Sequence, residues 1–335
     1  ILYFLSLFLV IKISIYFIVF STLCLLRHYT YHSYILDLGN YEQILWNTSH
    51  GRWFELSTRP WTNSYLGDHF SPILIIPSLI YKIFPFTATI FIFQTAIISV
   101  SGYLIFLLAK NWGFSKKQSL FFSLIFLTFP ALGFINIFDA HSNVLAIPLA
   151  LLFLYAFQNK NYKQLLLYFF LLLMVKEDLS LIMAAFGLSI VFDKGHRRLG
   201  LFLLLFSLAW FYLVMTVIIP SFTLNGAYHY VEQMVNAESA QGNIFSILSH
   251  PFMIIKTILS TQKIGYILVL FGSTFFIPLF SGRFSLPVLL GLAPILINKW
   301  TTPSTIAYHY PASFLAFAIL ALMSSLVWCN KNYHI

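Results

Sequence analysis

The chain has 335 residues, of which 59% are hydrophobic and only 9% are charged. A soluble domain carries about 25% charged residues, so this chain cannot cover itself with polar surface, and lipid must surround most of it. The net charge of +9 does not indicate nucleic-acid binding, because the basic residues lie in short clusters between apolar runs, as they do in cytoplasmic loops.

Long apolar runs without alternation predict transmembrane helices rather than a barrel. We expect an all-α, polytopic protein with about ten transmembrane helices, which form a single integral membrane domain over residues 1–335 of a cell (inner) membrane. The predicted crossings are, in chain order, 1–26, 87–109, 118–135, 143–157, 164–176, 179–193, 199–220, 264–281, 285–297 and 309–328.

The apolar run 70–84 decides the threading. Its 15 residues would span only about 22 Å as a helix, and Ser71, Ser78 and Lys82 form one polar stripe, which predicts a helix along the interface. If this run does not cross, the basic clusters all fall on one side, which is then the cytoplasm. The clusters contain Lys110, Lys116, Lys117, Lys160, Lys163, Lys194, Arg197, Arg198, Arg283 and Lys331.

This threading places nearly all acidic residues on the opposite, non-cytoplasmic side, which also carries two long loops, 27–69 and 221–263. The acidic residues on that side are Asp37, Glu42, Glu55, Asp68, Asp139, Glu177, Asp178, Glu232 and Glu238, and only Asp193 is cytoplasmic. Acidic residues barely influence orientation, so this bias is independent of the basic one. We therefore expect the activity of the protein on the non-cytoplasmic face.

The first outer loop is predicted to contain a second membrane-lying helix, over 38–50. Asp37 is placed to cap it and Gly51 to terminate it. Its apolar stripe, which should face the membrane, consists of Leu38, Tyr41, Ile44 and Leu45. Asp68 and His69 follow in a polar turn before the run 70–84.

Two short crossings end in polar clusters, which suggests a polar cavity that dips into the outer leaflet. One cluster holds Asp139 and His141, and the other holds Lys176, Glu177 and Asp178. Such residues also commonly cap helices or extend to the interface. Converging acids and histidines could act as general acid and base or bind a divalent cation, for which the candidate ligands are Asp68, Asp139, His141 and Glu177.

The remaining loops add groups that could hold a phosphate. The candidates are Arg52, Arg59, Lys176 and Lys299, and the last outer loop also supplies His309 and Tyr310. The loop 221–263 carries the run YHYVEQ and then a stretch with the pattern of an amphipathic helix. No phosphate-binding GxxxxGK[ST] or dinucleotide-binding GxGxxG motif occurs, so neither nucleotide site is indicated.

Four ordered blocks carry a resemblance to a known family. They read LDLGNYEQILWNTSHG, LGDHFSP, FDAHSN and KEDLS. Over roughly residues 27–315 the chain resembles a prokaryotic family of integral membrane proteins that is catalogued as a domain of unknown function and grouped with the GT-C membrane glycosyltransferases. Where relatives commonly have Asp-Gln, this chain has Glu42-Gln43.

The resemblance implies transfer of a sugar from a polyprenyl-phosphate carrier to an acceptor outside the cytoplasm. It also implies an acidic residue near the reaction centre in the first outer loop, where this chain has Asp37, and two helices lying along the membrane, which match 38–50 and 70–84. On this hypothesis Asp37 is the catalytic base and Lys176 or Arg59 holds the phosphate. The other expected substrate contacts are Glu42, Asp68, His69, Asp139, His141, Glu177, Asp178, His309 and Tyr310.

Two other functions fit the same polar groups. A transporter or flippase for a lipid-linked or small polar solute would also place charged residues near the membrane. It should have polar groups across the midplane and inverted repeats, and the sequence indicates neither. A third possibility is a non-enzymatic scaffold.

Overall fold

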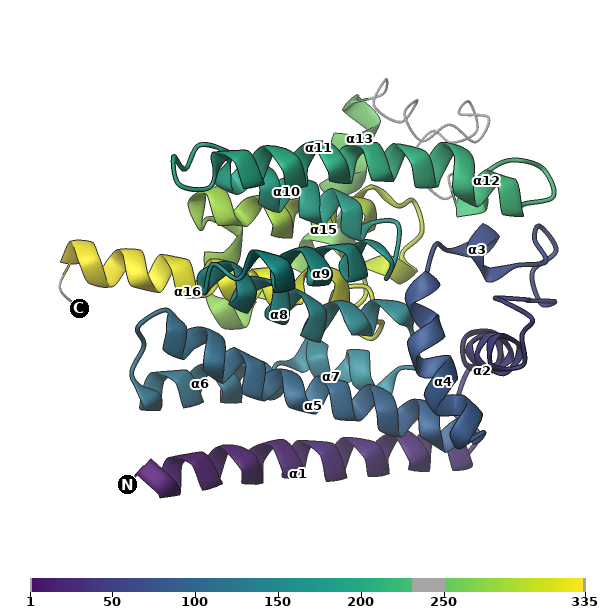
Figure 1. Ribbon diagram of the computed structural model, residues 1–335, viewed down its shortest axis with the longest axis horizontal. Coiled ribbons are helices and arrows are strands. Elements are labelled where there is room, and N and C mark those ends of the chain that lie inside the picture. The colour runs from purple at the N-terminus through teal and green to yellow at the C-terminus, as the bar shows by residue number, and fades with distance from the viewer. Residues whose placement is uncertain (1, 231–250, 334–335) are drawn as a thin grey trace.

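The computed structural model describes residues 2–230 and 251–333, and the regular structure of that part is helical (Figure 1). The α-helices are α1 (Leu2–Tyr29), α2 (Ile35–Ser49), α3 (Tyr65–Asp68), α4 (Ile75–Ile83), α5 (Thr87–Asn111), α6 (Lys116–Leu127), α7 (Pro130–Ile137), α8 (Ala146–Gln158), α9 (Tyr162–Leu173), α10 (Leu179–Val191), α11 (Arg197–Leu213), α12 (Ile219–Phe222), α13 (Pro251–Ile258), α14 (Thr261–Phe271), α15 (Ser285–Ile297) and α16 (Ala312–Tyr333). The shorter turns are η1 (Pro72–Leu74), η2 (Ser142–Leu145), the π-helix η3 (Val214–Ile218), η7 (Gly272–Thr274), η8 (Ile277–Leu279), η9 (Gly282–Phe284) and η10 (Thr302–Ser304). The predicted outer acids Glu232 and Glu238 lie outside the described residues.

Several helices are long and apolar enough to cross a membrane. Within the described ranges there are four, Leu7–Tyr29, Thr87–Asn111, Arg197–Phe222 and Ala312–Cys329. The number rises to six if two bent pairs each form one span, α6 with α7 at 47° and α13 with α14 at 58°. The chain is therefore a helical, multi-pass membrane protein. The prediction of about ten crossings also needs the shorter apolar helices α8, α9, α10 and α15, and it stays a prediction.

The predicted crossing at 264–281 is wrong as a single helix. α14 ends at Phe271, and the chain turns at Phe275 and Phe276, whose φ angles of 51° and 59° lie in the left-handed region. Pro278 lies in the separate turn η8. Because a residue with positive φ cannot continue a right-handed helix, the apolar run is divided despite its uniform composition.

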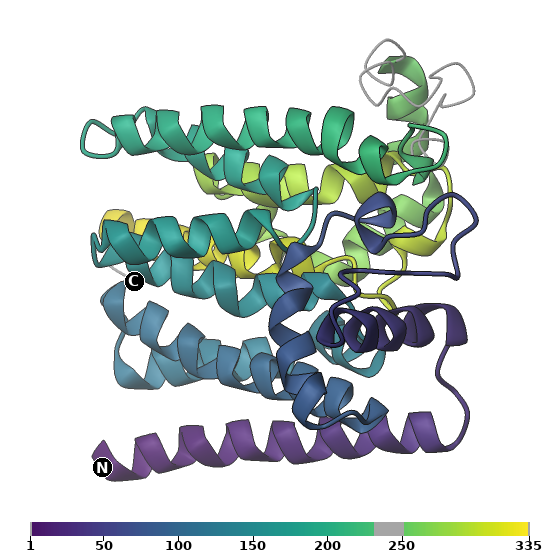
Figure 2. The same ribbon diagram turned by 45° about the vertical axis from the view of Figure 1, so that its right-hand side comes forward.

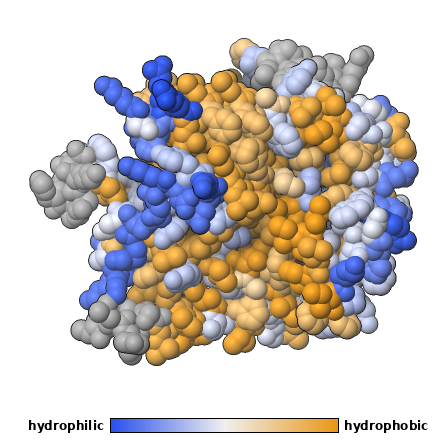
Figure 3. Space-filling model, in the orientation of Figure 1, coloured by the Kyte–Doolittle hydropathy of each residue, from blue (hydrophilic) through white to orange (hydrophobic). Residues whose placement is uncertain are grey.

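The long helices pack side by side, with α1 beginning and α16 ending at the same end of the bundle (Figure 1). The opposite end carries α2, α3 and α4, and we call it the α2 end. There α4 runs across the direction of the long helices in both views, and α2 is seen end-on in Figure 1 while the long helices lie in the plane of the picture (Figures 1 and 2). Figure 3 shows an apolar band between two polar ends, as expected for a surface that lipid surrounds.

Helix α2 begins earlier than predicted and buries its apolar stripe. It starts at Ile35, so Asp37 lies in the first turn rather than at the cap, and it ends before Gly51, whose φ is 84°. The predicted stripe faces a core cluster shared with residues of α4 and α5, and its members Leu38, Tyr41, Ile44 and Leu45 are at most 5% exposed. The stripe therefore packs against protein. The prediction that it faces the membrane is wrong.

The run 70–84 forms η1 and α4, with its polar side turned inward. Ser71 is buried and donates to Val175 O at 2.7 Å, while the buried Ser78 donates to Leu74 O at 2.7 Å. Of the predicted stripe, only Lys82 is exposed. The exposed face is apolar, because Leu79 and Ile83 are 60% and 71% exposed.

The main core lies among α5, α8, α9, α10, α15 and α16. α10 and α11 approach most closely where two glycines meet. A Cβ on Gly187 would lie 2.8 Å from the carbonyl oxygen of Gly200, so side chains there would push the helices apart. This close packing fixes the second half of α10 relative to the start of α11.

Candidate active site

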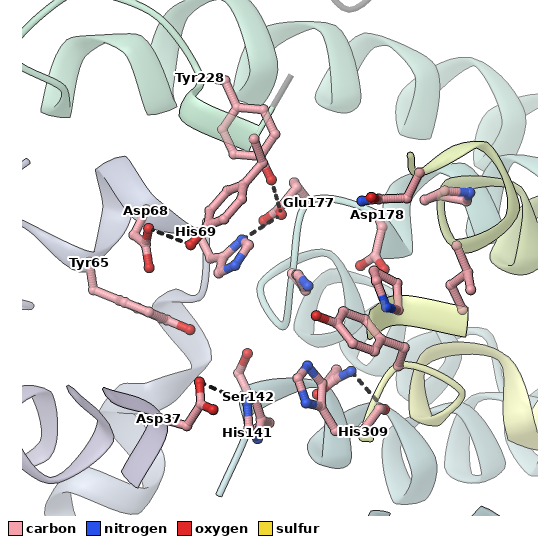
Figure 4. A pocket seen from close by; sticks show the side chains of 18 of the residues that line it. Asp37, Tyr65, Asp68, His69, His141, Ser142, Glu177, Asp178, Tyr228 and His309 are labelled. Carbon is pink, nitrogen blue, oxygen red and sulfur yellow. Dashed lines mark hydrogen bonds and ion pairs between the residues drawn. The ribbon is translucent and has the colours of Figure 1, made fainter. Parts of the chain in front are cut away.

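A cavity of about 220 Å³ lies at the α2 end, and Figure 4 shows the side chains around it. The predicted catalytic base and all of the predicted substrate contacts except Glu42 and Asp139 line it. The lining residues are Asp37, Asn40, Tyr41, Arg59, Tyr65, Asp68, His69, His141, Ser142, Asn143, Lys176, Glu177, Asp178, Leu181, Phe211, Met215, Tyr228, Tyr230, Pro294, Ile295, Asn298, Pro303, His309 and Tyr310. Segments far apart in the sequence therefore meet in one place.

Glu42 and Asp139 join elements next to the cavity. Glu42 accepts from the hydroxyl of Tyr81 at 2.9 Å and from Thr87 Oγ1 at 2.7 Å, which ties α2 to α4 and the start of α5. Asp139 is buried and accepts from Arg27 at 2.5 Å and from the backbone N–H of Tyr34 at 2.7 Å. These contacts hold the end of α1 and the start of α2 in position.

The carboxylate of Asp68 is surrounded by donors. It is 1% exposed and accepts from Arg59 Nε at 3.3 Å, from Trp61 Nε1 at 3.2 Å and from the hydroxyl of Tyr230 at 2.9 Å. Because its oxygens are occupied in this way, Asp68 holds the cavity wall together rather than presenting a free carboxylate.

The carboxylate of Glu177 is likewise occupied. It accepts from His69 Nδ1 at 2.8 Å, from the backbone N–H of Phe70 at 3.1 Å and from the hydroxyl of Tyr228 at 2.8 Å (Figure 4). Burial alone would raise the pKa of Glu177, but the charge and hydrogen bond of His69, followed by the charge of Lys176, outweigh it and lower the pKa to about 2. Glu177 therefore stays ionised at neutral pH.

Gly67 allows Asp68 and His69 to reach the cavity. A Cβ at this position would collide with Thr62 Oγ1 and lie 2.7 Å from the carbonyl oxygen of Phe222, where α3 packs on α12. We expect Gly67→Ala to lower the free energy of unfolding by about 1–3 kcal/mol, because the overlap must push these elements apart.

Thermal unfolding of the purified protein in detergent measures this effect. The matched control is Gly265→Ala in α14, where an added Cβ meets nothing within 4 Å. Equal stability of the two variants would contradict the close approach at Gly67.

The carboxylate of Asp37 differs from those of Asp68 and Glu177. It makes no hydrogen bond within the described part of the chain, and its nearest ionic neighbour is His141 Nε2, at 3.8 Å from Oδ1. His141 Nδ1 lies 2.8 Å from the carbonyl oxygen of Asp139, so Nδ1 carries the proton and Nε2 faces Asp37. Burial raises the pKa of Asp37, but the adjacent His141 and the charges of Arg59 and His69 outweigh this effect, so the pKa is lowered.

Lys176 provides an ammonium group without a hydrogen-bond acceptor among the residues that the structure describes. Its Nζ lies 6.0 Å from the ring centre of Tyr310. Burial would lower its pKa, but the charges of Asp178 and Glu177 outweigh this effect and raise the pKa, so the group is charged. Arg59 also lines the cavity, and its Nε donates to Asp68 Oδ2 at 3.3 Å.

The other predicted phosphate ligands lie away from the cavity. Arg52 pairs with Glu55 at 3.6 Å, where both side chains are about half exposed at 54% and 53%. Lys299 is exposed and is not part of the cavity lining.

The four candidate metal ligands do not converge. No three His, Cys, Asp or Glu side chains in residues 2–230 and 251–333 are placed to hold one metal ion. Asp139 is paired with Arg27 outside the cavity lining, and Asp68 and Glu177 are each surrounded by three donors. Those donors occupy the oxygens that a cation would need.

Several lining residues were not predicted as site residues. Tyr228 and Tyr230 belong to the run YHYVEQ, which had no assigned role, and Tyr41 belonged to an apolar stripe. Asn143 lies in the block FDAHSN, next to the ionisable residues Asp139 and His141. The alternation Tyr-His-Tyr in a polar loop was the one available signal, since tyrosines commonly place a hydroxyl at the edge of a buried site.

Comparison with known proteins identifies a family. The family model described as "Predicted membrane protein (DUF2079)" matches residues 27–335. No curated protein and no solved structure matches the chain.

Proposed function

The chain belongs to the family of predicted membrane proteins designated DUF2079, and from this premise we propose that it is a membrane glycosyltransferase. It moves a sugar from a polyprenyl-phosphate carrier to an acceptor on the non-cytoplasmic face. The observation that carries the proposal is a pair of opposite charges in one cavity, the carboxylate of Asp37 and the ammonium of Lys176, neither of which has a hydrogen-bond partner among the described residues. Both side chains are partly buried, and polar groups that leave water normally form hydrogen bonds, so a ligand is expected to supply them.

Asp37 serves as the general base. An acceptor hydroxyl attacks the anomeric carbon of the sugar and transfers its proton to the carboxylate of Asp37. The new bond joins the acceptor oxygen to the anomeric carbon, while the bond from that carbon to the phosphate oxygen breaks and its electron pair leaves on the phosphate. Because this is a single displacement, it inverts the configuration at the anomeric carbon.

Lys176 and Arg59 stabilise the departing phosphate. Lys176 offers three N–H donors that no described acceptor occupies, and the two guanidinium nitrogens of Arg59 other than Nε likewise have no acceptor among the described residues. Negative charge grows on the phosphate oxygens as the bond breaks, and donors fixed in advance are the main source of such stabilisation.

One wall of the same cavity is apolar and suits the carrier lipid. Leu181 of α10, Phe211 of α11 and Met215 of η3 line it, together with Pro294 and Ile295 of α15. Polar groups from the loops thus face apolar groups from the long helices, which suits a ligand with a charged head and an apolar tail.

The orientation rests on the basic residues. The loops between α5 and α6, α8 and α9, and α10 and α11 lie at the end of the bundle opposite α2 and carry the basic clusters (Figure 1). By the positive-inside rule that end faces the cytoplasm, so the cavity faces outward. With the long helices crossing the bilayer, α2 and α4 lie along its outer surface, and the apolar side chains of α4 contact lipid.

Lys176→Met tests this proposal through binding of polyprenyl phosphate to the protein in nanodiscs. A hydrogen bond to a charged group contributes about 1.5–3 kcal/mol, so we expect the dissociation constant to rise about 10- to 100-fold. Wild-type protein should also transfer radiolabelled sugar from a polyprenyl-phosphate hexose.

Lys299→Met is the matched control, because Lys299 is exposed and lies outside the cavity lining. Its affinity for the lipid phosphate should equal that of the wild type. If both lysine variants bind the lipid as the wild type does, Lys176 is not a phosphate ligand and the proposal loses its main support.

A further inference from the structure

Three side chains of the cavity lining carry buried polar atoms that lack a hydrogen-bond partner within the described residues. The atoms are Asn143 Oδ1, Asp178 Oδ1 and His309 Nδ1. Native proteins leave few buried polar atoms unpaired, and several at one cavity indicate a ligand that completes them.

Asn143 is held so that its oxygen remains available. It is 2% exposed, and its Nδ2 donates to the carbonyl oxygen of His309 at 3.1 Å. That bond fixes the orientation of the amide, because the carbonyl can only accept, and it leaves Oδ1 as a free acceptor.

His309 is fixed by its neighbours. It is 8% exposed, and its ring stacks on those of His141 and Tyr310, with centroids 3.4 and 4.4 Å apart. Burial lowers the pKa of His309 well below its usual value, and the nearby charges of His141, Lys176 and His69 lower it further. The ring is therefore neutral at neutral pH and offers one donor and one acceptor nitrogen.

Asp178 is only partly satisfied. Its Oδ2 accepts from Ser313 Oγ at 3.3 Å, and its Oδ1 has no partner in the part of the chain that the structure describes. By contrast, Glu177, the next residue along the chain, receives three donors. The difference identifies Asp178 as the acid of this segment that is left for a ligand.

On the basis of the proposed function, we infer that Asn143, Asp178 and His309 form the subsite for the transferred sugar, and that this sugar is neutral with free hydroxyl groups. A hydroxyl group both donates and accepts, so hydroxyls can satisfy two free oxygens and a ring nitrogen in either tautomer. An acidic sugar would place its carboxylate against Asp178, where Lys176 is already engaged by the phosphate.

The test compares two ligands on the intact protein in nanodiscs, polyprenyl phosphate and the same lipid carrying a neutral hexose. Asp178→Asn keeps the shape of the side chain and replaces one acceptor oxygen by a donor. We expect the variant to bind the glycosylated lipid about 10-fold more weakly than the wild type, while binding bare polyprenyl phosphate no more weakly.

The matched control is Asp193→Asn, an acid at the opposite end of the bundle that pairs with His196 and Arg283. It should leave both affinities unchanged. In wild-type protein, a lipid carrying a uronic acid should bind more weakly than one carrying the neutral hexose.

The outcomes separate the two proposals. If Asp178→Asn weakens both ligands equally, or neither, the sugar subsite is wrong while the proposed function stands. Stronger binding of the uronic-acid lipid than of the hexose lipid would also overturn it. If wild-type protein binds neither lipid, the proposed function fails and the subsite fails with it.

Discussion

Replacing Asp37 with Asn is expected to lower the rate of sugar transfer by about 10²- to 10⁴-fold, the usual contribution of a general base. Asn has the same shape but cannot take up the proton of the acceptor hydroxyl. Since Asp37 makes no hydrogen bond to other described residues, the variant should fold and insert as the wild type does. Transfer of radiolabel from a polyprenyl-phosphate hexose, with thermal unfolding of the same sample, measures both properties.

Glu55→Gln is the matched control for Asp37→Asn, because Glu55 is an acid of the same loop that is 53% exposed and lies outside the cavity lining. It should transfer sugar at the wild-type rate. The pKa of Asp37 lies below its usual value of 3.8, so its carboxylate should stay ionised, and titration of Asp37 should not limit the rate, until the pH falls below about 4. Wild-type rates in Asp37→Asn would remove this residue from the chemistry.

Arg27→Met is expected to cost about 3–5 kcal/mol of stability, the usual effect of removing one partner of a buried ion pair. Asp139 has no exposed surface, and Arg27 is 17% exposed. Met fills similar space, but the carboxylate of Asp139 then keeps only the hydrogen bond from the backbone N–H of Tyr34 and loses the positive charge of Arg27. A lower midpoint of thermal unfolding in detergent would show this loss.

Two further variants test the cause of the Arg27→Met loss. Adding Asp139→Asn to Arg27→Met removes the uncompensated charge and should recover part of the stability. Arg283→Met breaks an exposed pair with Asp193 and should change stability by less than about 1 kcal/mol. An equal loss in Arg27→Met and Arg283→Met would show that the buried pair adds nothing beyond surface electrostatics.

Composition and local pattern were sufficient to predict the helical class and the membrane environment. Few charges and long apolar runs allow no other solvent, and backbone hydrogen bonding in lipid then favours helices. Gly51 was predicted to end α2, and it does, because a residue with positive φ stops a helix wherever it occurs. The break in the helix predicted over 264–281 could not be found in this way, because nothing in the uniform composition of that run marks the turn at Phe275 and Phe276.

The sequence also indicated most of the polar residues that line the cavity, but it could not say which of them are occupied. In the sequence, Asp37, Asp68 and Glu177 are each an acidic residue in a polar segment, and nothing there shows which of them will be hydrogen-bonded. Their difference comes from partners far away in the chain, such as Tyr230, which lies 162 residues after Asp68, and Tyr228, which lies 51 residues after Glu177. A carboxylate is free or satisfied according to how many donors the fold brings within hydrogen-bond distance. Only the tertiary structure decides that number, and it leaves Asp37 without a hydrogen-bond donor among the described residues.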